Sequence, residues 1–230
     1  MVKYFELQQR AEGFGAHYQA AMSIFAYCEK HKEYEFVFRG FKSIGHHLNG
    51  KALTKFCGIP VNNKKLQIDK SDIYSREGMA KEYYTPKVVD TLRKYYYTNP
   101  KPNVNTDIAI HIRRGDVTCP EIYNERWVEM DYYIKIIEKL KSIYPNRIIS
   151  IFSQGNLEMF KELWGANIKF ELDKDIEYTY HSMVKAKVLL IAPSTLSFSA
   201  AILNTNKIYF LKVTAPVAFD YWECIDKDLL

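Results

Sequence analysis

The sequence predicts an α/β protein made of two halves, and three observations lead to this class. Short β-branched runs alternate with longer amphipathic stretches throughout the second half of the chain. The first half begins in the same way, with an apolar run, a glycine-containing turn and a helical pattern. Between the halves, residues 98–103 hold two prolines and no periodic pattern. Regular alternation of strand and helix is typical of parallel sheets that are covered by helices on both faces.

Four elements are predicted in the first half, and its middle gives no clear pattern. Pro86 suits the first turn of a helix, because proline lacks the N–H that a helix start leaves unused. The predicted elements are an edge-like strand at 3–8, a strand at 35–38, and helices at 16–30 and 86–97. The break at 98–103 then makes residues 1–100 the first domain.

The second half, residues 104–230, has the clearer alternation and forms the second domain. Its predicted strands are at 107–112, 147–152, 168–170, 188–192 and 207–211, and its predicted helices are at 131–143, 156–164, 176–187 and 197–203. Open α/β sheets bind ligands at the carboxyl ends of their strands. We therefore expect the chemistry in a cleft between the strand ends of the two domains.

Composition excludes several classes of function. The formal charge of +5 is spread along the chain without a dense basic run, and no nucleic-acid-binding motif is visible, so we expect no nucleic acid partner. A mild basic excess fits a small anion such as a diphosphate. The cysteines are far apart in sequence and predict reduced thiols: Cys28, Cys57, Cys119 and Cys224. Without a signal-like start or an apolar run of about 18 residues, we expect a cytoplasmic protein with no membrane span.

The strongest chemical signal is the segment His-Ile-Arg-Arg-Gly-Asp at residues 111–116, where a predicted buried strand ends. The guanidinium groups of Arg113 and Arg114 suit a diphosphate, because a planar fork donates paired hydrogen bonds to phosphate oxygens and stays charged. His111 and Asp116 either orient that fork or reach sugar hydroxyls. Taken alone, the motif is more often a solvated loop beside a satisfied core histidine.

A second signal lies at the start of the predicted helix at 197–203. The preceding strand leads into Ser194 and Thr195, and Ser197 follows at the helix itself. A helix start offers free N–H groups, and these bind phosphate. A single serine or threonine at this place is more often an ordinary helix cap. Together with the arginine motif, contact with a phosphate becomes the better interpretation.

The motif His-x-Arg-Arg-Gly-Asp at 111–116 resembles the signature of the α-1,2-fucosyltransferases and of the related α-1,6- and protein O-fucosyltransferases. The resemblance continues in a helix-like segment at 82–90, a strand-like segment at 150–154 and an ungapped stretch at 191–204. It covers most of residues 82–211. The departures of the stretch at 191–204 from the family pattern Ile-Ala-Asn-Ser-Thr-Phe-Ser-Trp-Trp-Ala-Ala-Trp-Leu-Asn include Pro193, Phe198, Ser199 and Ile202. These departures concern the choice of acceptor and the linkage.

The resemblance implies a GT-B-like fold of two small Rossmann-like domains. It implies an inverting, metal-independent glycosyltransferase that moves fucose from GDP-fucose to a glycan hydroxyl, without a further cofactor. The acceptor belongs mainly to domain 1–100 and the nucleotide sugar to domain 104–230. The residues expected to bind the donor are Gly13, Gly15, His111, Arg113, Arg114, Ser153, Gln154, Ser194, Thr195 and Ser197.

The expected catalytic residues are Arg113, Glu12 and Asp116. Glu12 stands in a glycine-containing segment that is similar to the first loop of one class of protein O-fucosyltransferases, in which the matching glutamate is the catalytic base. Without the resemblance, Glu12 is equally a first-turn residue that stabilises a helix dipole, and His17 a helix residue that faces solvent.

Three alternatives stay open. The pair Asp173 and Asp175 has the Asp-x-Asp spacing of the manganese-dependent glycosyltransferases, although a match this short needs structural support. In the second alternative the donor is a different nucleotide sugar, because no motif in the sequence is specific for the fucose ring. In the third, the chain is a carbohydrate-binding module of the same fold without turnover.

Overall fold

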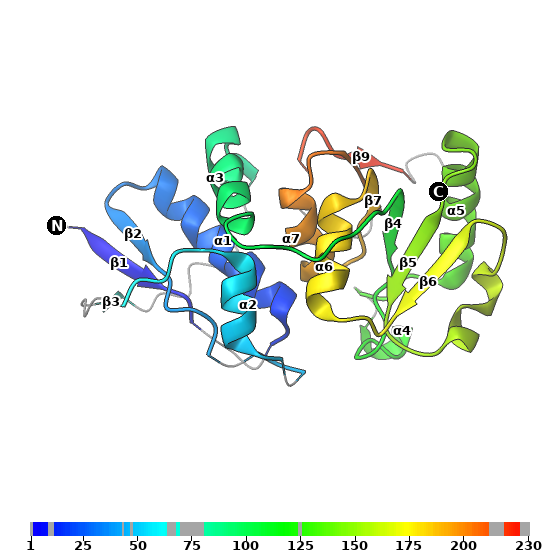
Figure 1. Ribbon diagram of the computed structural model, residues 1–230, viewed down its shortest axis with the longest axis horizontal. Helices are drawn as coiled ribbons and strands as arrows, with labels where there is room; N and C mark the ends of the chain where they lie inside the picture. The colour runs from blue at the N-terminus through cyan, green and yellow to red at the C-terminus, as the bar shows by residue number, and fades with distance from the viewer. Residues whose placement is uncertain are drawn as a thin grey trace. The chain divides into compact units, whose positions relative to one another are not determined.

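The computed structural model shows two compact units, Met1–Lys101 (unit 1) and Pro102–Leu230 (unit 2) (Figure 1). The structure describes residues 2–8, 12–42, 44–46, 48–63, 68–69, 81–123, 126–211 and 219–225. Each unit holds its own parallel sheet. The predicted α/β class is therefore confirmed.

Unit 1 is built on a three-stranded sheet in which β1 (Lys3–Glu6) lies between β2 (Tyr34–Val37) and β3 (Ile68–Asp69). Both pairings are parallel. The prediction that β1 is an edge strand was wrong, because β3 comes from the stretch whose sequence gives no clear pattern. Parallel neighbours need a crossover, and α1 (Phe14–Lys30) provides it between β1 and β2.

Helices pack beside this sheet. Most residues of α1 are buried, so this helix is a core element and not an amphipathic surface helix. The unpredicted helix α2 (Gly50–Cys57) begins after Asn49, whose side chain accepts from the Ala52 amide, and ends at Gly58 with φ of 69°. The short η3 (Lys81–Tyr83) precedes α3 (Pro86–Tyr96), which Thr85 caps.

Unit 2 contains a six-stranded, fully parallel sheet in the order β6-β5-β4-β7-β8-β9. Its strands are β4 (Ile108–His111), β5 (Ile149–Ser153), β6 (Ile168–Leu172), β7 (Val188–Leu190), β8 (Lys207–Phe210) and β9 (Glu223–Cys224). Counted along the chain, this order is 3-2-1-4-5-6, as in dinucleotide-binding folds. The direction of winding reverses between β4 and β7, and ligands bind at such a switch point.

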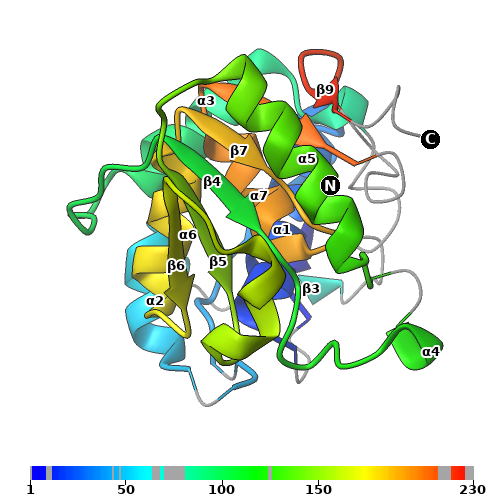
Figure 2. The same cartoon turned by 90° about the vertical axis from the view of Figure 1, so that its right-hand side faces the viewer.

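Helices cover both faces of this sheet (Figures 1 and 2). One face carries α5 (Met130–Ile143), and the other carries α6 (Ile176–Lys185) and α7 (Thr195–Leu203). The short α4 (Pro120–Tyr123) precedes α5. The predicted helix at 156–164 is instead the 3₁₀ helix η4 (Leu157–Leu163), because Phe160, at φ of −119°, interrupts a regular helical backbone.

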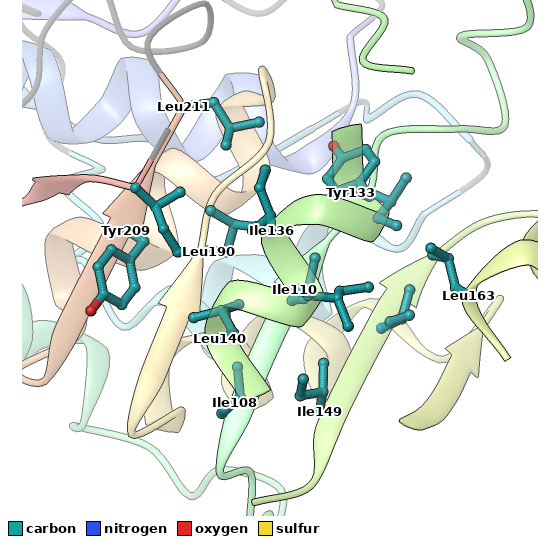
Figure 3. Packing of buried hydrophobic residues seen from close by; sticks show 14 of the residues in the cluster. Ile108, Ile110, Tyr133, Ile136, Leu140, Ile149, Leu163, Leu190, Tyr209 and Leu211 are labelled. Carbon is teal, nitrogen blue, oxygen red and sulfur yellow. The ribbon is translucent and has the colours of Figure 1, made fainter. Parts of the chain in front are cut away.

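The core of unit 2 forms where the strands meet α5 (Figure 3). Ile108 and Ile110 of β4 point to the same cluster as Tyr133 and Leu140 of α5. Burying one such aliphatic side chain stabilises a fold by roughly 1.5–3 kcal/mol. Because side chains alternate along a strand, His111 is directed to the opposite face of the sheet.

The predicted break packs on unit 1. The Asn99 side chain donates to the Lys55 carbonyl (2.8 Å), and the Lys101 ammonium donates to the Phe56 carbonyl (2.7 Å). The ammonium of Lys101 also lies 4.4 Å from the Tyr96 ring centroid. These contacts fix the last residues of unit 1. Within the described residues, no helix has the length and apolar character needed to cross a membrane.

Candidate functional site

The two sequence signals of unit 2 meet at the carboxyl edge of its sheet. The arginine motif follows β4, and the serine-containing helix start follows β7, so the two segments flank the switch point. The parallel register pairs Ile110 with Leu190, which brings the two strand ends level. The sheet therefore places residues more than 80 positions apart in contact.

Arg113 joins these two segments. Its Nη1 donates to Ser194 Oγ across the switch point (3.3 Å), and its Nη2 donates to Asp116 Oδ2 (2.6 Å). About a fifth of the side chain is exposed. Its Nε is buried and has no hydrogen-bond partner among the described residues. Arg113 thus presents a guanidinium that is oriented by two contacts and still carries unused donor capacity.

The start of α7 is built by serines. Ser194 is its N-cap, and Ser194 Oγ accepts from the Leu196 amide (3.3 Å). Ser197 is fully buried, and its Oγ accepts from the Ala192 amide (3.2 Å), so this hydroxyl braces the turn before the helix. Thr195 is exposed at the first helical position. The amides of Thr195 and Ser197 have no helical carbonyl to bond, which makes this end of α7 attractive to an anion.

Arg114 lies in a different environment from Arg113. It is only 4% exposed, and its guanidinium donates to the carbonyls of Arg113 and Val128, both at 2.8 Å. The guanidinium carbon lies 3.8 Å from the centroid of the Trp127 ring. Burial lowers the pKa of Arg114 from its ordinary value. No sequence pattern pointed to Trp127 or Val128, because a contact across 14 residues inside a loop has no periodicity.

His111 is a buried, neutral imidazole. Burial and, to a smaller extent, the positive charge of Arg113 together lower its pKa to about 3. Its Nδ1 is buried without a hydrogen-bond partner among the described residues. Such an orphaned ring nitrogen has a cost unless a ligand or water satisfies it. The imidazole can donate or accept a hydrogen bond, but at neutral pH it carries no charge.

The end of β5 supports the arginine loop. Ser153 Oγ donates to the Ile112 carbonyl (2.8 Å), directly before Arg113. The exposed Gln154 lies against Gly115, where a methyl group would come within 2.5 Å of Gln154 Oε1. Gly115 also has φ of 87°, a conformation that other residues rarely adopt. The turn after Arg114 therefore needs glycine, and Ser153 acts on the backbone of the loop.

The predicted residues of unit 1 gather at the start of α1. Gly13 is the N-cap, Gly15 is buried in the first turn, and Glu12 is exposed. The Glu12 carbonyl accepts from the Gly45 amide (2.7 Å), which holds this turn in place. His17 is 2% exposed, and its Nδ1 lies 3.2 Å from the Gly13 carbonyl oxygen. The prediction that His17 faces solvent was wrong, because α1 is buried on most of its surface.

The Asp-x-Asp pair is occupied by main-chain hydrogen bonds. Asp173 Oδ2 accepts from the Gly155 amide (3.2 Å). Asp175 is the N-cap of α6, and its Oδ1 accepts from the amides of Glu177 (2.8 Å) and Tyr178 (3.2 Å). Among the residues that the structure describes, no three His, Cys, Asp or Glu side chains are grouped to hold a metal ion. Both carboxylates have an architectural role in this fold.

The fold defines an α/β protein whose unit 2 has the strand order of dinucleotide-binding sheets. No known family profile and no curated protein matches the sequence. Among solved structures, the chain is similar to the E. coli heptosyltransferase WaaC with ADP-2-deoxy-2-fluoro heptose, with a TM-score of 0.47, 10% identity and coverage of 97% of this chain and 92% of that one. The structure of WaaC with ADP gives a TM-score of 0.41, 11% identity and coverage of 91% and 86%. Likenesses of this size show nothing about the chemistry of this chain.

Proposed function

We propose that the chain is an inverting glycosyltransferase that binds the diphosphate of a nucleotide sugar at the carboxyl edge of the sheet of unit 2. We assign GDP-fucose as the donor and a glycan hydroxyl as the acceptor. The donor assignment rests on the resemblance of residues 111–116 and 191–204 to the fucosyltransferases. The diphosphate assignment has independent support from the geometry of unit 2.

The observation that carries the proposal is the contact from Arg113 Nη1 to Ser194 Oγ, at 3.3 Å across the switch point. It places a fixed guanidinium beside the start of α7, which carries partial positive charge. These are two independent attractions for an anion, and they converge where open α/β sheets bind ligands. A diphosphate has enough oxygens to bond the guanidinium and the helix amides together.

In the proposed reaction, Arg113 stabilises the departing diphosphate. The acceptor oxygen attacks the anomeric carbon from the face opposite the diphosphate, the bond from that carbon to the phosphate oxygen breaks, and GDP leaves with the electron pair. Glu12 takes the proton of the acceptor hydroxyl, an assignment that rests on the resemblance of its loop. Asp116 acts through Arg113, because its carboxylate accepts from Arg113 Nη2 at 2.6 Å and so sets the angle of the fork.

The neutral state of His111 fits this role. A charged imidazole would repel the neighbouring guanidinium of Arg113. The low pKa of His111 keeps the imidazole uncharged at neutral pH. The unpartnered Nδ1 of His111 is then available for a hydrogen bond with the donor or with an ordered water. Gln154, Thr195 and the helix amides complete the assigned donor contacts, while Ser153 and Ser197 hold the two loops.

We propose that the reaction needs no divalent metal, because Arg113 and the start of α7 supply the positive potential that a metal supplies elsewhere. Asp173 and Asp175 are engaged in main-chain hydrogen bonds in unit 2. We also propose a cytoplasmic location, for which the free state of the four cysteines is the support.

A donor screen tests the proposal. The melting temperature of the protein is measured with GDP, UDP, dTDP and ADP and their sugars, and the sugars that stabilise it are then assayed for transfer. The proposal predicts stabilisation by GDP and GDP-fucose, lost in Arg113→Ala and kept in Arg147→Ala, a matched arginine at the other end of the sheet. If only another nucleotide sugar stabilises the protein, that sugar replaces GDP-fucose as the assigned donor. Binding of glycan without any nucleotide response would instead identify a binding module.

A further inference from the structure

The connection between β4 and α5 is unusually long for the first loop of a dinucleotide-binding sheet. Such a loop is normally a short glycine-rich turn, whereas here residues 112–129 separate the strand from the helix and include α4. Arg113 stands near the beginning of this connection. Closing a long loop costs more conformational entropy than closing a short turn, so a contact at the base of this loop has more entropy to offset.

Arg114 joins the two ends of this connection. Its Nη1 donates to the Arg113 carbonyl and its Nη2 donates to the Val128 carbonyl, each at 2.8 Å. The first carbonyl belongs to the residue that contacts Ser194, and the second lies two residues before α5. One guanidinium thus closes a loop of 14 residues at its base.

The surroundings of Arg114 fit a support better than a ligand contact. The side chain is 4% exposed, and its guanidinium carbon stacks at 3.8 Å on the Trp127 ring. Val128, in the loop, and Tyr133, in α5, are also buried. Burial raises the pKa of the Tyr133 hydroxyl, and the positive charge of Arg114 opposes that shift. Arginine suits this place and lysine does not, because only a planar fork can bond two carbonyls and stack on an aromatic ring at once.

We propose that Arg114 is a positioning residue that clasps the β4–α5 connection and thereby holds Arg113 and Asp116 in the geometry that receives the diphosphate. The clasp consists of Arg114, Trp127 and the carbonyls of Arg113 and Val128. The effect of the clasp on ligand binding rests on the proposed function of Arg113. The effect of the clasp on the loop is independent of that function, so a separate experiment measures each effect.

The first experiment follows hydrogen–deuterium exchange in the protein without ligand. Arg114→Lys and Trp127→Leu are compared with the wild type and with Arg147→Lys, an exposed arginine at the other end of the sheet. The clasp predicts that in both clasp variants the amides within 115–129 exchange on the order of tenfold faster than in the wild type. Exchange in β4 and α5 should stay as in the wild type, and so should the melting temperature of the control variant. Unchanged exchange in 115–129 overturns the proposal, whatever the protein binds.

The second experiment is a double-mutant cycle on GDP affinity, measured by calorimetry. Arg114→Lys is expected to lower the affinity for GDP about tenfold, and Arg113→Ala to lower it more. If Arg114 acts only through Arg113, the double variant Arg113→Ala with Arg114→Lys binds GDP no more weakly than Arg113→Ala alone. Additive losses would mean that Arg114 contacts the ligand directly and would overturn the clasp. A wild-type protein that binds no GDP would refute the proposed donor, and the exchange experiment would still decide the clasp.

Discussion

The two ends of the sheet of unit 2 both carry charged side chains, and they differ in how those charges are satisfied. At the amino end, Asp107 accepts from Lys187 (2.6 Å) and from Arg147 (3.4 Å). The hydrogen bond from Lys187 holds the pKa of Asp107 below its usual range. Nearby, Lys207 pairs with Glu223. At the carboxyl end, Arg113 shares its contacts between a carboxylate and a neutral hydroxyl, and its Nε lacks a partner among the described residues.

This comparison separates a hollow from a binding site. A hollow of about 170 Å³ lies at the amino end, lined by Asp107, Ile108, Tyr144, Arg147, Lys187, Val188 and Lys207. The cations that line it already pair with carboxylates, Lys187 and Arg147 with Asp107 and Lys207 with Glu223, so the gain from binding an anion there is small. At the carboxyl end, orphaned donors and a helix start converge instead. Unsatisfied polar groups, rather than volume, therefore mark the candidate site.

The largest expected effect is at Arg113. Arg113→Lys keeps the charge but loses the fork, and removal of one oriented donor to a developing negative charge slows reactions about 10²–10³-fold. We expect a loss of that size in the rate of fucose transfer. The matched change Arg147→Lys should leave the rate within about twofold, because surface charges at a distance contribute little. An Arg113→Lys enzyme with the wild-type rate would contradict the role of the fork.

A change at Glu12 should separate chemistry from binding. Glu12→Gln keeps the size of the side chain and removes the proton acceptor, so the transfer rate should fall about 10²-fold while the affinity for GDP stays unchanged. A rate assay and calorimetry on the same preparation measure the two quantities. If Glu12→Gln transfers sugar at the normal rate, the base lies elsewhere, and Asp116 is the next residue to test.

His111 should make the stability of the protein depend on pH. Its pKa is about 3 in the folded protein and near 6.5 when unfolded, so below pH 6.5 the unfolded chain binds a proton that the folded chain does not. Stability from this group is complete above pH 6.5 and is lost as the pH falls toward 3, by about 2 kcal/mol between pH 7 and pH 5. Urea unfolding at both pH values measures it. His111→Asn should lose less stability over that interval, and an equal loss would refute the buried neutral state.

The smallest expected effect is at the amino end. Asp107→Asn removes the acceptor of two cations and should lower the free energy of unfolding by about 0.5–1 kcal/mol at pH 7. Because the pKa of Asp107 is lowered in the fold, this contribution is present above its unfolded value and disappears as the pH falls through the folded one. GDP binding should stay unchanged. A loss of GDP affinity in Asp107→Asn would break the contrast between the two ends.

The elements of unit 2 were largely readable from the sequence, because a buried parallel strand is a continuous apolar run and its helices keep a regular period. The same logic located Arg113 and Ser194, since both follow a strand end. The burial of Arg114 could not be predicted from the sequence, because it depends on contacts with Trp127 and Val128 at the far end of a loop. The burial of His17 depends in turn on how many elements surround α1.

Helix α2 of unit 1 was not predicted, although its sequence carries signals that indicate a helix. Helix α2 has Asn49 as its cap and Gly58 after its last residue, with Leu53 and Phe56 buried on one face. Those are ordinary start, stop and spacing signals. Strand β3 gave no such signal, because a strand of two residues is too short for any period. Strand β1 is central only because β3 pairs with its second edge, so the sequence, which does not predict β3, places β1 at the edge of the sheet.

The most direct test of the account is calorimetric titration of GDP into the wild type, Arg113→Ala and Arg147→Ala, all in excess EDTA. The account predicts that the wild type and Arg147→Ala bind GDP with affinities within about twofold of each other, since exposed charges far from a site contribute little. Arg113→Ala should bind at least about tenfold more weakly, because a charge-assisted contact is lost. Equal affinity in Arg113→Ala, or binding that appears only when manganese is restored, would contradict a diphosphate site built from Arg113 and the start of α7.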